Sequence, residues 1–387
     1  MSNFQRWVLT DVASGYWLEQ FHVSGGDVPS VPGRDWHITK HTLHGGLREG
    51  IDLVELCNGP FAVRVLPTRG AGLWNAVYNG MRLGWDAPIH GPVHPKFVSL
   101  PDRGGIGWLA GFDEWLCRCG LSSNGPPGLD GGTALPLHGR IANLPAHHVE
   151  VAVNLESPHE ILCRCQVEEA GLFLGRLRLT STVRMALGAN RLTIHDVVEN
   201  LSSGPAEMQL LYHLNFGPPL LQENATVSVP FEEMAPQTPR AAEGIGEHSC
   251  YLAPTPGYAE QVYLFRPTSG PTGETCALLT NAAQDRGAAV HWNVRQLPCF
   301  TIWKNTIPLS DGYVTGLEPA TNYPYFKSHE RTHGRVVKLE GGARWEAEWH
   351  IDALDSAAAV RGVQQSIASI QAHGKAITHP SPVWAPA

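Results

Sequence analysis

The stretch at residues 147–156 reads "HHVEVAVNLE" and indicates the fold of this chain most directly. Its apolar and polar residues alternate, with Val149, Val151, Val153 and Leu155 on one side and Glu150, Asn154 and Glu156 on the other. Successive side chains of a β-strand point to opposite faces of the sheet. The pattern therefore predicts a strand with one face buried and the other in water.

The same alternation recurs along most of the chain. Near the end, residues 344–352 read "RWEAEWHID" and follow a Gly341-Gly342 turn signal. Further alternating runs, separated by Gly/Pro clusters, lie at 61–66, 172–186, 191–199, 208–216, 261–266 and 298–304. Many strands without amphipathic helices between them predict an all-β fold, a large antiparallel β-sandwich. Since no linker or internal repeat interrupts the pattern, we expect residues 1–387 to form a single domain.

Two segments depart from the strand pattern. Residues 101–132 are rich in glycine, which predicts a long ordered loop with one short helix. Residues 353–372 are the one convincing helical window, ended by His373-Gly374 and followed by a Pro-rich tail. We therefore expect a β-sandwich core over 45–352 and a C-terminal helix and tail over 353–387.

Charge and hydropathy exclude two classes of partner. The net charge is -8, and no block of Lys/Arg occurs in the 387 residues. An acidic chain without a basic stripe is unsuited to nucleic acid or to an anionic membrane surface. No run approaches the ~18 apolar residues of a membrane span. The sequence predicts a small-molecule partner and leaves the oligomeric state open.

The cysteines and the N-terminus point to the cytoplasm. Eight cysteines include two C-R-C pairs, Cys117/Cys119 and Cys163/Cys165, whose spacing suits neither a mutual disulfide nor a C-x-x-C zinc site. The first residues lack the apolar core of a secretory signal. We therefore predict reduced thiols and a cytoplasmic location.

Residues 328–334 read "SHERTHG" and contain a literal H-E-x-x-H, the signature of zinc proteases. A zinc-protease helix needs an apolar stripe, and none surrounds this motif. Gly334 would end any helix after about one turn, and strand-like alternation resumes directly afterwards. We therefore predict no metal site here. Instead we expect His329 or His333 to line the rim of a substrate cleft.

A strand near the middle of the chain combines a core face with a polar face. Residues 208–217 read "MQLLYHLNFG", so that apolar side chains fill one face. Gln209, His213 and Asn215 share the opposite face with one leucine. A strand of this kind is typical of the floor of a wet cleft.

Two further motifs place polar groups at turns and strand ends. Residues 137–145 read "LHGRIANLP", which puts His138 in a His-Gly turn. Residues 316–324 read "GLEPATNYP", in which Glu318 ends a strand because Pro319 cannot extend the ladder.

Together these motifs resemble the aldose 1-epimerase (galactose mutarotase) superfamily. Its members carry an H-G turn, a later strand with N-H-x-Y-F-N-L and an E-P near the C-terminus, in this chain order. Residues 137–145, 208–217 and 316–324 are similar to them, and "CFTIWKN" at 299–305 resembles the Trp-Asn strand of the bacterial hexose-6-phosphate branch. The resemblance covers roughly residues 45–352 and implies the galactose mutarotase-like supersandwich.

The sequence also departs from that family's pattern. Ala142 stands where an arginine is expected, with Arg140 two positions earlier, and Lys304 replaces a neutral polar residue. The Gly-rich insertion at 101–132 and the run at 66–86 resemble an uncharacterised branch of the superfamily.

The resemblance implies an isomerase that interconverts sugar anomers without a cofactor or a metal. Mutarotation removes a proton from O1 of a pyranose while the ring oxygen gains one, and the ring then closes on the other face of the carbonyl carbon. A carboxylate base and an imidazole acid suffice, each supplying about 10²–10⁴-fold. By resemblance Glu318 is the base and His213 the acid, while His138 holds or protonates the ring oxygen.

The candidate substrate-binding residues combine hydrogen-bonding groups with aromatic surfaces. They are Arg69, Asp113, Asn143, Asn215, Trp303, Lys304 and His329, with Trp108 as a second aromatic surface.

Two other function classes stay open at this point. The same scaffold could carry an isomerase or a β-eliminating lyase of an oxidised (keto) sugar, for which Arg69, Asp113 and Lys304 are suitable. It could also be a non-catalytic carbohydrate-binding protein, because fold does not imply function.

Overall fold

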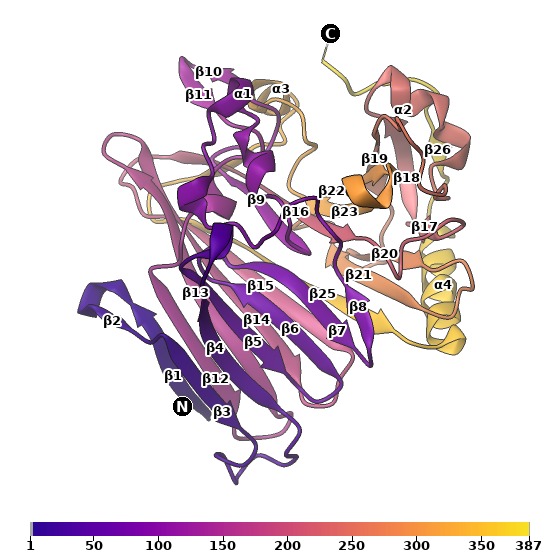
Figure 1. Ribbon diagram of the computed structural model, residues 1–387. Helices are drawn as coiled ribbons and strands as arrows, with labels where there is room; N and C mark the ends of the chain where they lie inside the picture. Colours follow the sequence, from indigo (N-terminus) through magenta and orange to yellow (C-terminus); the bar gives the residue numbers. More distant parts are fainter. Residues whose placement is uncertain (1–2, 387) are drawn as a thin grey trace.

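The computed structural model describes residues 3–386, which form two large β-sheets packed face to face (Figure 1). The first sheet has ten antiparallel strands. In spatial order they are β17 (Thr226–Ser228), β20 (Glu274–Thr280), β21 (Gly287–Asn293), β25 (Arg344–Leu354), β15 (Arg191–Asn200), β14 (Gly175–Ala186), β13 (Glu160–Gly171), β12 (His148–Asn154), β1 (Phe4–Asp11) and β2 (Tyr16–Trp17).

The second sheet has fourteen strands. Its main path is β26 (Ile377–Thr378), β18 (Phe231–Pro236), β19 (Gln261–Pro267), β22 (Cys299–Asn305), β23 (Val314–Ala320), β16 (Ala206–Phe216), β9 (Leu116–Leu121), β7 (Gly72–Tyr78), β6 (Phe61–Leu66), β5 (Ile51–Cys57), β4 (His37–Leu43) and β3 (Gln20–Ser24). Off this path β24 (Val337–Leu339) pairs with β16 and β8 (Met81–Leu83) with β7. Within the described residues, only the β18–β26 pair is parallel.

Short elements cap the sandwich at one end, where α1 (Asp102–Gly105), α3 (Lys327–Thr332) and the hairpin of β10 (Gly128–Asp130) and β11 (Thr133–Leu135) gather in Figure 1. The helix α2 (Pro239–Glu243) lies beside β18 and β19. Two 3₁₀ turns, Gly107–Gly111 and Ile141–Asn143, belong to the same capping region. Of these elements, the turn Gly107–Gly111 contributes Trp108 and Leu109 to the wall of the candidate site.

The predicted all-β antiparallel sandwich is confirmed, and alternation explains it strand by strand. In β12, Val149, Val151 and Val153 are buried in the core between the sheets. In β16, all five predicted apolar side chains, from Met208 to Phe216, enter the same core. The other face of β16 looks out of the sandwich into the capping region, because neighbouring strand residues point to opposite sides.

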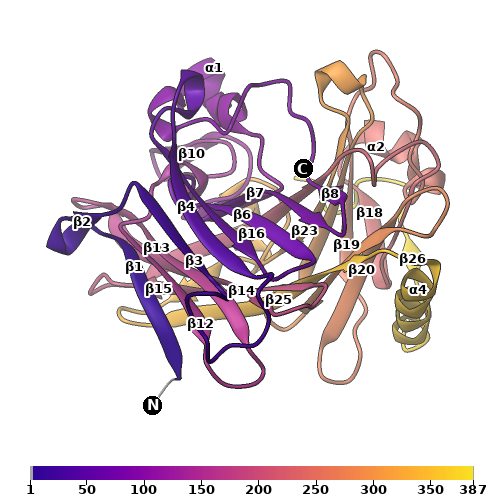
Figure 2. The ribbon, with the colours of Figure 1, turned by 60° about the horizontal axis from the view of Figure 1, so that its bottom comes forward.

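The C-terminal helix is present but begins later than residue 353. The helix α4 spans Ala357–Gln371, and Ser356 caps it by accepting a hydrogen bond from the Ala359 N–H. Residues 353–354 instead complete β25. In Figure 2 α4 lies at one end of the molecule beside β20 and β26, and its Val360 and Ile367 pack on the outer face of the ten-stranded sheet.

The prediction for residues 101–132 is wrong in one important respect. The segment holds the expected short helix, α1, but it also contributes β9, a central strand between β16 and β7. All six residues of β9 are buried. A strand buried on both faces has no period-2 polarity, so its pattern could not separate it from the glycine-rich loop around it.

The H-E-x-x-H segment at 328–334 lies on a short helix, which ends just before Gly334 as predicted. Lys327–Thr332 form the short helix α3, which ends at His333 just before Gly334. Six residues are too few to show helical periodicity in the sequence.

All eight cysteines are free thiols in the structure, as predicted. Among residues 3–386, no helix combines the length and the apolar character needed to span a bilayer.

Candidate active site

The register of the fourteen-stranded sheet brings the two main predicted residues together. Strands β16 and β23 pair Leu214 with Leu317 and Asn215 with Gly316, so His213 lies opposite Glu318. Their side chains meet on the outer face of the sheet, with Nε2 of His213 3.2 Å from Oε1 of Glu318. Gly316 makes this approach possible, because a Cβ there would lie 2.4 Å from Oε1 of Glu318.

The pair lies at the base of a cavity of about 360 Å³, within the size range of small-molecule sites. The lining combines aromatic walls with a few polar groups: Trp108, Leu109, Phe112, Pro126, Leu137, His138, His213, Gln237, Glu260, Val262, Trp303, Glu318, Pro324 and Tyr325. Rings surround His213 closely, with the centroids of Phe112 and Trp303 at 5.0 and 5.3 Å from its own.

Asn215 fixes the tautomer of His213. The amide nitrogen of Asn215 donates to two backbone carbonyls, of Glu114 and of His213, at 2.9 and 3.0 Å. Its Oδ1 must therefore be the atom that faces Nδ1 of His213, 2.6 Å away. A carbonyl oxygen only accepts, so Nδ1 carries the hydrogen. In the neutral imidazole, Nε2 is then a free acceptor pointing toward Glu318.

Glu318 is buried without a cation. Its side chain is 3% exposed, and Oε1 makes no aligned hydrogen bond with any described residue although Nε2 of His213 is close. Burial, and then the negative charge of Glu260, raise the pKa of Glu318 well above its usual value. Burial, and then His138, lower the pKa of His213 to about 3. Both shifts favour a neutral pair in which Glu318 holds the proton.

His138 is the third predicted catalytic residue and also lines the cavity. It lies in the left-handed region at φ 57°, and its Nδ1 donates to the Asn124 carbonyl at 2.9 Å. Burial lowers its pKa to about 4, so at neutral pH Nε2 is an unprotonated acceptor. The ring packs edge-on against Trp108, with centroids 4.7 Å apart.

Two predicted substrate-binding residues lie outside the cavity and hold the capping region together. Arg69 is buried and pairs with Glu114 at 2.6 Å, and its guanidinium also donates to the Gly111 carbonyl. It further donates to Oδ1 of Asn143 at 2.6 Å. Through these contacts Arg69 connects the two 3₁₀ turns of the capping region, one containing Gly111 and the other Asn143.

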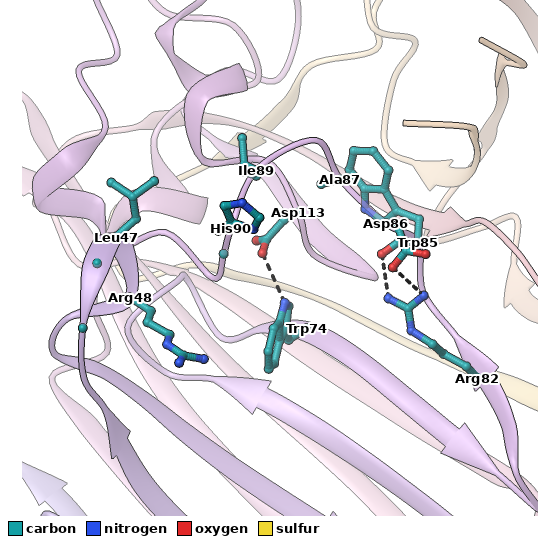
Figure 3. A pocket seen from close by; sticks show the side chains of 13 residues that line it. Leu47, Arg48, Trp74, Arg82, Trp85, Asp86, Ala87, Ile89, His90 and Asp113 are labelled. Atoms are coloured by element: carbon teal, nitrogen blue, oxygen red, sulfur yellow. Dashed lines mark hydrogen bonds and ion pairs between the residues drawn. The ribbon is translucent and has the colours of Figure 1, made fainter. Parts of the chain in front are cut away.

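Asp113 lines a different and larger cavity of about 720 Å³ (Figure 3). Trp74 donates its indole N–H to Oδ2 of Asp113 at 3.1 Å. Burial, and then the charge of Glu114, raise the pKa of Asp113 to about 7. We take the smaller cavity as the candidate active site because it contains the paired acid and base. Size alone would favour the cavity of Asp113.

Trp303 and Lys304 are adjacent in β22 and therefore point to opposite faces. Trp303 lines the cavity and donates its indole N–H to Glu260 at 2.7 Å. The Lys304 ammonium turns away and donates to the Glu247 carbonyl at 3.0 Å and to that of Cys250. Burial lowers the pKa of Lys304 to about 8.

His329 lies behind the cavity wall and is not part of its lining. Its ring packs against Tyr325, which does line the cavity, and against His333. Nε2 of His329 approaches the Trp384 carbonyl at 3.0 Å. The H-E-x-x-H glutamate, Glu330, pairs with Arg335 at 2.6 Å.

Sequence reasoning missed Phe112, Gln237, Glu260 and Tyr325 among the lining residues. They come from loops and strand ends far apart in sequence, and no local pattern marks them. The run "GFDEW" at 111–115 is the nearest signal, because Phe112 precedes the predicted Asp113 in it.

Comparison with known proteins supports the family assignment. The family model described as a domain of unknown function (DUF4432) matches residues 48–353. The crystal structure of a "putative aldose 1-epimerase" from Klebsiella pneumoniae is 34% identical in sequence, with a TM-score of 0.95. The match covers 98% of this chain and 99% of that one. No curated protein matches the chain.

More distant structures share the fold. A galactose mutarotase-like protein from Clostridium acetobutylicum is 14% identical with a TM-score of 0.57, over 83% of this chain and 99% of that one. An aldose epimerase homologue from C. elegans is 13% identical with a TM-score of 0.51, over 79% and 99%. The chain thus belongs to the DUF4432 family and has the galactose mutarotase-like fold predicted from its motifs.

Proposed function

We propose that this protein is an aldose 1-epimerase that interconverts the anomers of a neutral sugar. The observation that carries the proposal is the His213–Glu318 pair, an imidazole and a carboxyl 3.2 Å apart at the base of an aromatic-walled cavity. The similarity to the Klebsiella pneumoniae protein adds support at the level of the family.

The pair carries one mobile proton, and mutarotation needs one donor and one acceptor. Transfer of the proton from Glu318 to Nε2 of His213 converts the neutral resting pair into its ionic form. In that form, the Glu318 carboxylate takes the proton from O1 while Nε2 of His213 gives one to the ring oxygen. The C1–O5 bond breaks, and the open-chain aldehyde leaves Glu318 protonated and His213 neutral. Closure on the other face of C1 reverses both transfers, so the pair returns to its starting state.

His138 would position the sugar in this scheme and would not protonate it. Its Nδ1 is committed to the Asn124 carbonyl, and its pKa of about 4 leaves Nε2 unprotonated. A neutral acceptor can hold a sugar hydroxyl group. Trp108 and Trp303 offer the flat apolar surfaces on which a sugar face can stack.

The lining also indicates the charge of the substrate. Of the described residues that line the cavity, none is a lysine or an arginine, whereas two are glutamates. A phosphosugar or a sugar acid would be desolvated there without a cationic partner, which is unfavourable. The basic residues that made a keto-sugar lyase or isomerase attractive, Arg69 and Lys304, lie elsewhere. We therefore propose a neutral aldose.

The test is NMR exchange spectroscopy of anomers with a panel of neutral aldoses, sugar phosphates, sugar acids and keto-sugars. We expect catalysed exchange of at least one neutral aldose and none of the anionic sugars. Glu318→Gln should lower the exchange rate by about 10²–10⁴-fold while sugar affinity is retained.

Other outcomes would contradict the proposal. Turnover of a keto-sugar alone would favour the lyase or isomerase. Sugar binding that is unchanged in Glu318→Gln, with no exchange in the wild type, would favour a carbohydrate-binding protein.

A further inference from the structure

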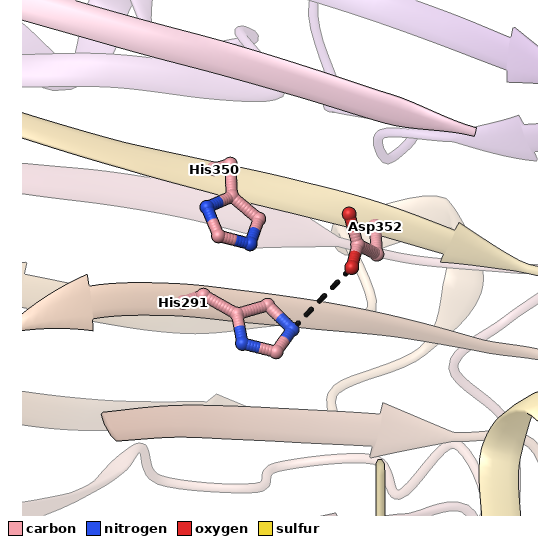
Figure 4. Close-up of side chains that lie close together, drawn as sticks. All are labelled: His291, His350 and Asp352. Carbon is pink, nitrogen blue, oxygen red and sulfur yellow. Dashed lines mark ion pairs between the residues drawn. The ribbon is translucent and has the colours of Figure 1, made fainter. Parts of the chain in front are cut away.

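A second cluster of histidines lies on the other sheet, on the outer face of the ten-stranded one. His291 of β21 is paired directly with His350 of β25, and their rings stack with centroids 4.5 Å apart (Figure 4). Asp352 follows two residues later on the same face of β25. One ligand atom from each of the three residues lies within 4.8 Å of the other two.

The cluster contains an imidazole nitrogen that makes no hydrogen bond and could bind a metal ion. Over residues 3–386, His291 Nε2 is buried without a hydrogen-bond partner, and its nearest carboxylate oxygen, on Asp352, is 3.6 Å away. A neutral imidazole binds metal ions through such a free ring nitrogen.

A cavity of about 320 Å³ adjoins the cluster and gives an ion access to it. Both histidines line this cavity, together with Cys276 of β20. Cys276 is paired directly with His291, so thiol, imidazole and imidazole follow one another across three adjacent strands. Ser366 and Ile370 of α4 close the cavity on one side.

Arg191 is the one feature that opposes a metal ion. It grips Asp352 with two hydrogen bonds, at 2.7 and 2.8 Å. Its side chain is 50% exposed and can turn into solvent, and a carboxylate has lone pairs beyond those used by the guanidinium. Arg191 therefore orients Asp352 but also lowers the affinity of the site for a cation.

We propose that His291, His350 and Asp352 bind a zinc ion that ties β21 to β25. Two imidazoles and a carboxylate are a zinc ligand set, completed by water or by the Cys276 thiolate. Zinc at about 2.0–2.1 Å from each ligand needs ligand atoms about 3.4 Å apart, so the stacked rings turn toward each other on binding. The site lies on the sheet opposite the candidate active site, which gives it a role in stability and none in anomer exchange.

The test is a zinc titration of the chelator-treated full-length protein by calorimetry. We expect one equivalent to bind and the melting temperature to rise with zinc concentration. His291→Gln and His350→Gln should each weaken binding by at least about 100-fold, and Arg191→Ala should strengthen it. Cobalt(II) in place of zinc reports the fourth ligand, because a sulfur-to-metal charge-transfer band appears only with Cys276 bound.

His195→Gln is the matched control, since His195 lies on the same outer face and forms only a half-exposed ion pair with Glu346. We expect zinc binding to be unchanged in this variant. The proposal is overturned if His291→Gln/His350→Gln binds zinc as tightly as the wild type, or if the wild type binds none. Circular dichroism checks that the double variant is folded.

Discussion

Buried carboxyl groups in this protein are stabilised in two different ways. Glu114 and Asp196 each face a fully buried arginine, Arg69 at 2.6 Å and Arg118 at 2.5 Å. Glu318 is equally buried but faces a neutral imidazole. A buried arginine fixes its partner carboxyl group in place by an ion pair, whereas burial without such a partner raises the pKa of Glu318. The difference separates groups that hold the sandwich together from one that can exchange a proton.

The largest effect on stability should come from the arginine-paired group. Asp196→Ala leaves the Arg118 guanidinium buried without its counter-ion and should lower the free energy of unfolding by about 3–5 kcal/mol. Glu318→Gln removes no ion pair and should change it by less than about 1 kcal/mol. Urea unfolding of both variants measures the contrast. Equal losses of unfolding free energy in the two variants would contradict the distinction between arginine-paired and unpaired carboxyl groups.

An exposed ion pair provides the control for that measurement. Glu243 pairs with Arg240 at the surface, and Glu243→Ala should cost no more than about 1 kcal/mol. A loss near that of Asp196→Ala would mean that burial does not decide the effect.

The next effect concerns pH and His138, a half-buried neutral group of the cavity wall. Its pKa is lowered from 6.5 to about 4. The unfolded chain gains a proton first, so this contribution to stability is complete above about pH 6.5 and is lost as the pH falls toward 4, by about 3 kcal/mol in total. Asn tolerates φ > 0 and does not titrate.

Between pH 7 and pH 4, wild-type stability should therefore fall by about 2–3 kcal/mol more than that of His138→Asn. Urea unfolding at each pH gives both values. Parallel pH profiles for the two proteins would show that His138 titrates normally.

A smaller effect, on the rate of anomer exchange, should follow from disturbing the contact between His213 and Glu318. Gly316→Ala places a Cβ against Oε1 of Glu318 and 3.2 Å from Cε1 of His213. We expect anomer exchange to fall by about 10–100-fold, which is roughly 1.4–2.7 kcal/mol in the activation free energy. Gly204→Ala, with no atom within 4 Å of the added Cβ, is the control and should keep full activity.

The smallest effect should come from the wall of the cavity. Trp303→Ala removes one stacking surface and should raise KM by about 3–10-fold with kcat nearly unchanged, since stacking serves ground state and transition state alike. A fall in kcat without a change in KM would instead mean that Trp303 positions His213.

Much of this architecture could be predicted because period-2 patterns report which side of a strand faces the core. The strands around β12 and β16 follow directly from them, and so do the core and cavity faces of β16. The strand β9 could not be found in this way, because a strand buried on both sides shows no alternation of apolar and polar residues. The helix α3 was too short to show its own period.

The candidate site was predictable where a strand register defines it. His213 and Glu318 meet because their strands pair, and Asn215 lies two residues from His213 on the same face. The predictions for Trp303 and Lys304 exclude each other, because the two residues are neighbours in one strand and cannot both face the substrate. Glu260 and Tyr325 reach the cavity only through tertiary packing.

The most direct test of the central claim is the protonation state of Glu318 at neutral pH. Infrared difference spectra, wild type minus Glu318→Gln, isolate its carboxyl absorption. We predict the C=O stretch of a protonated carboxylic acid at pH 7, because burial without a cation raises the pKa of Glu318. Carboxylate bands alone, persisting down to the pH range of an ordinary glutamate, would contradict the account.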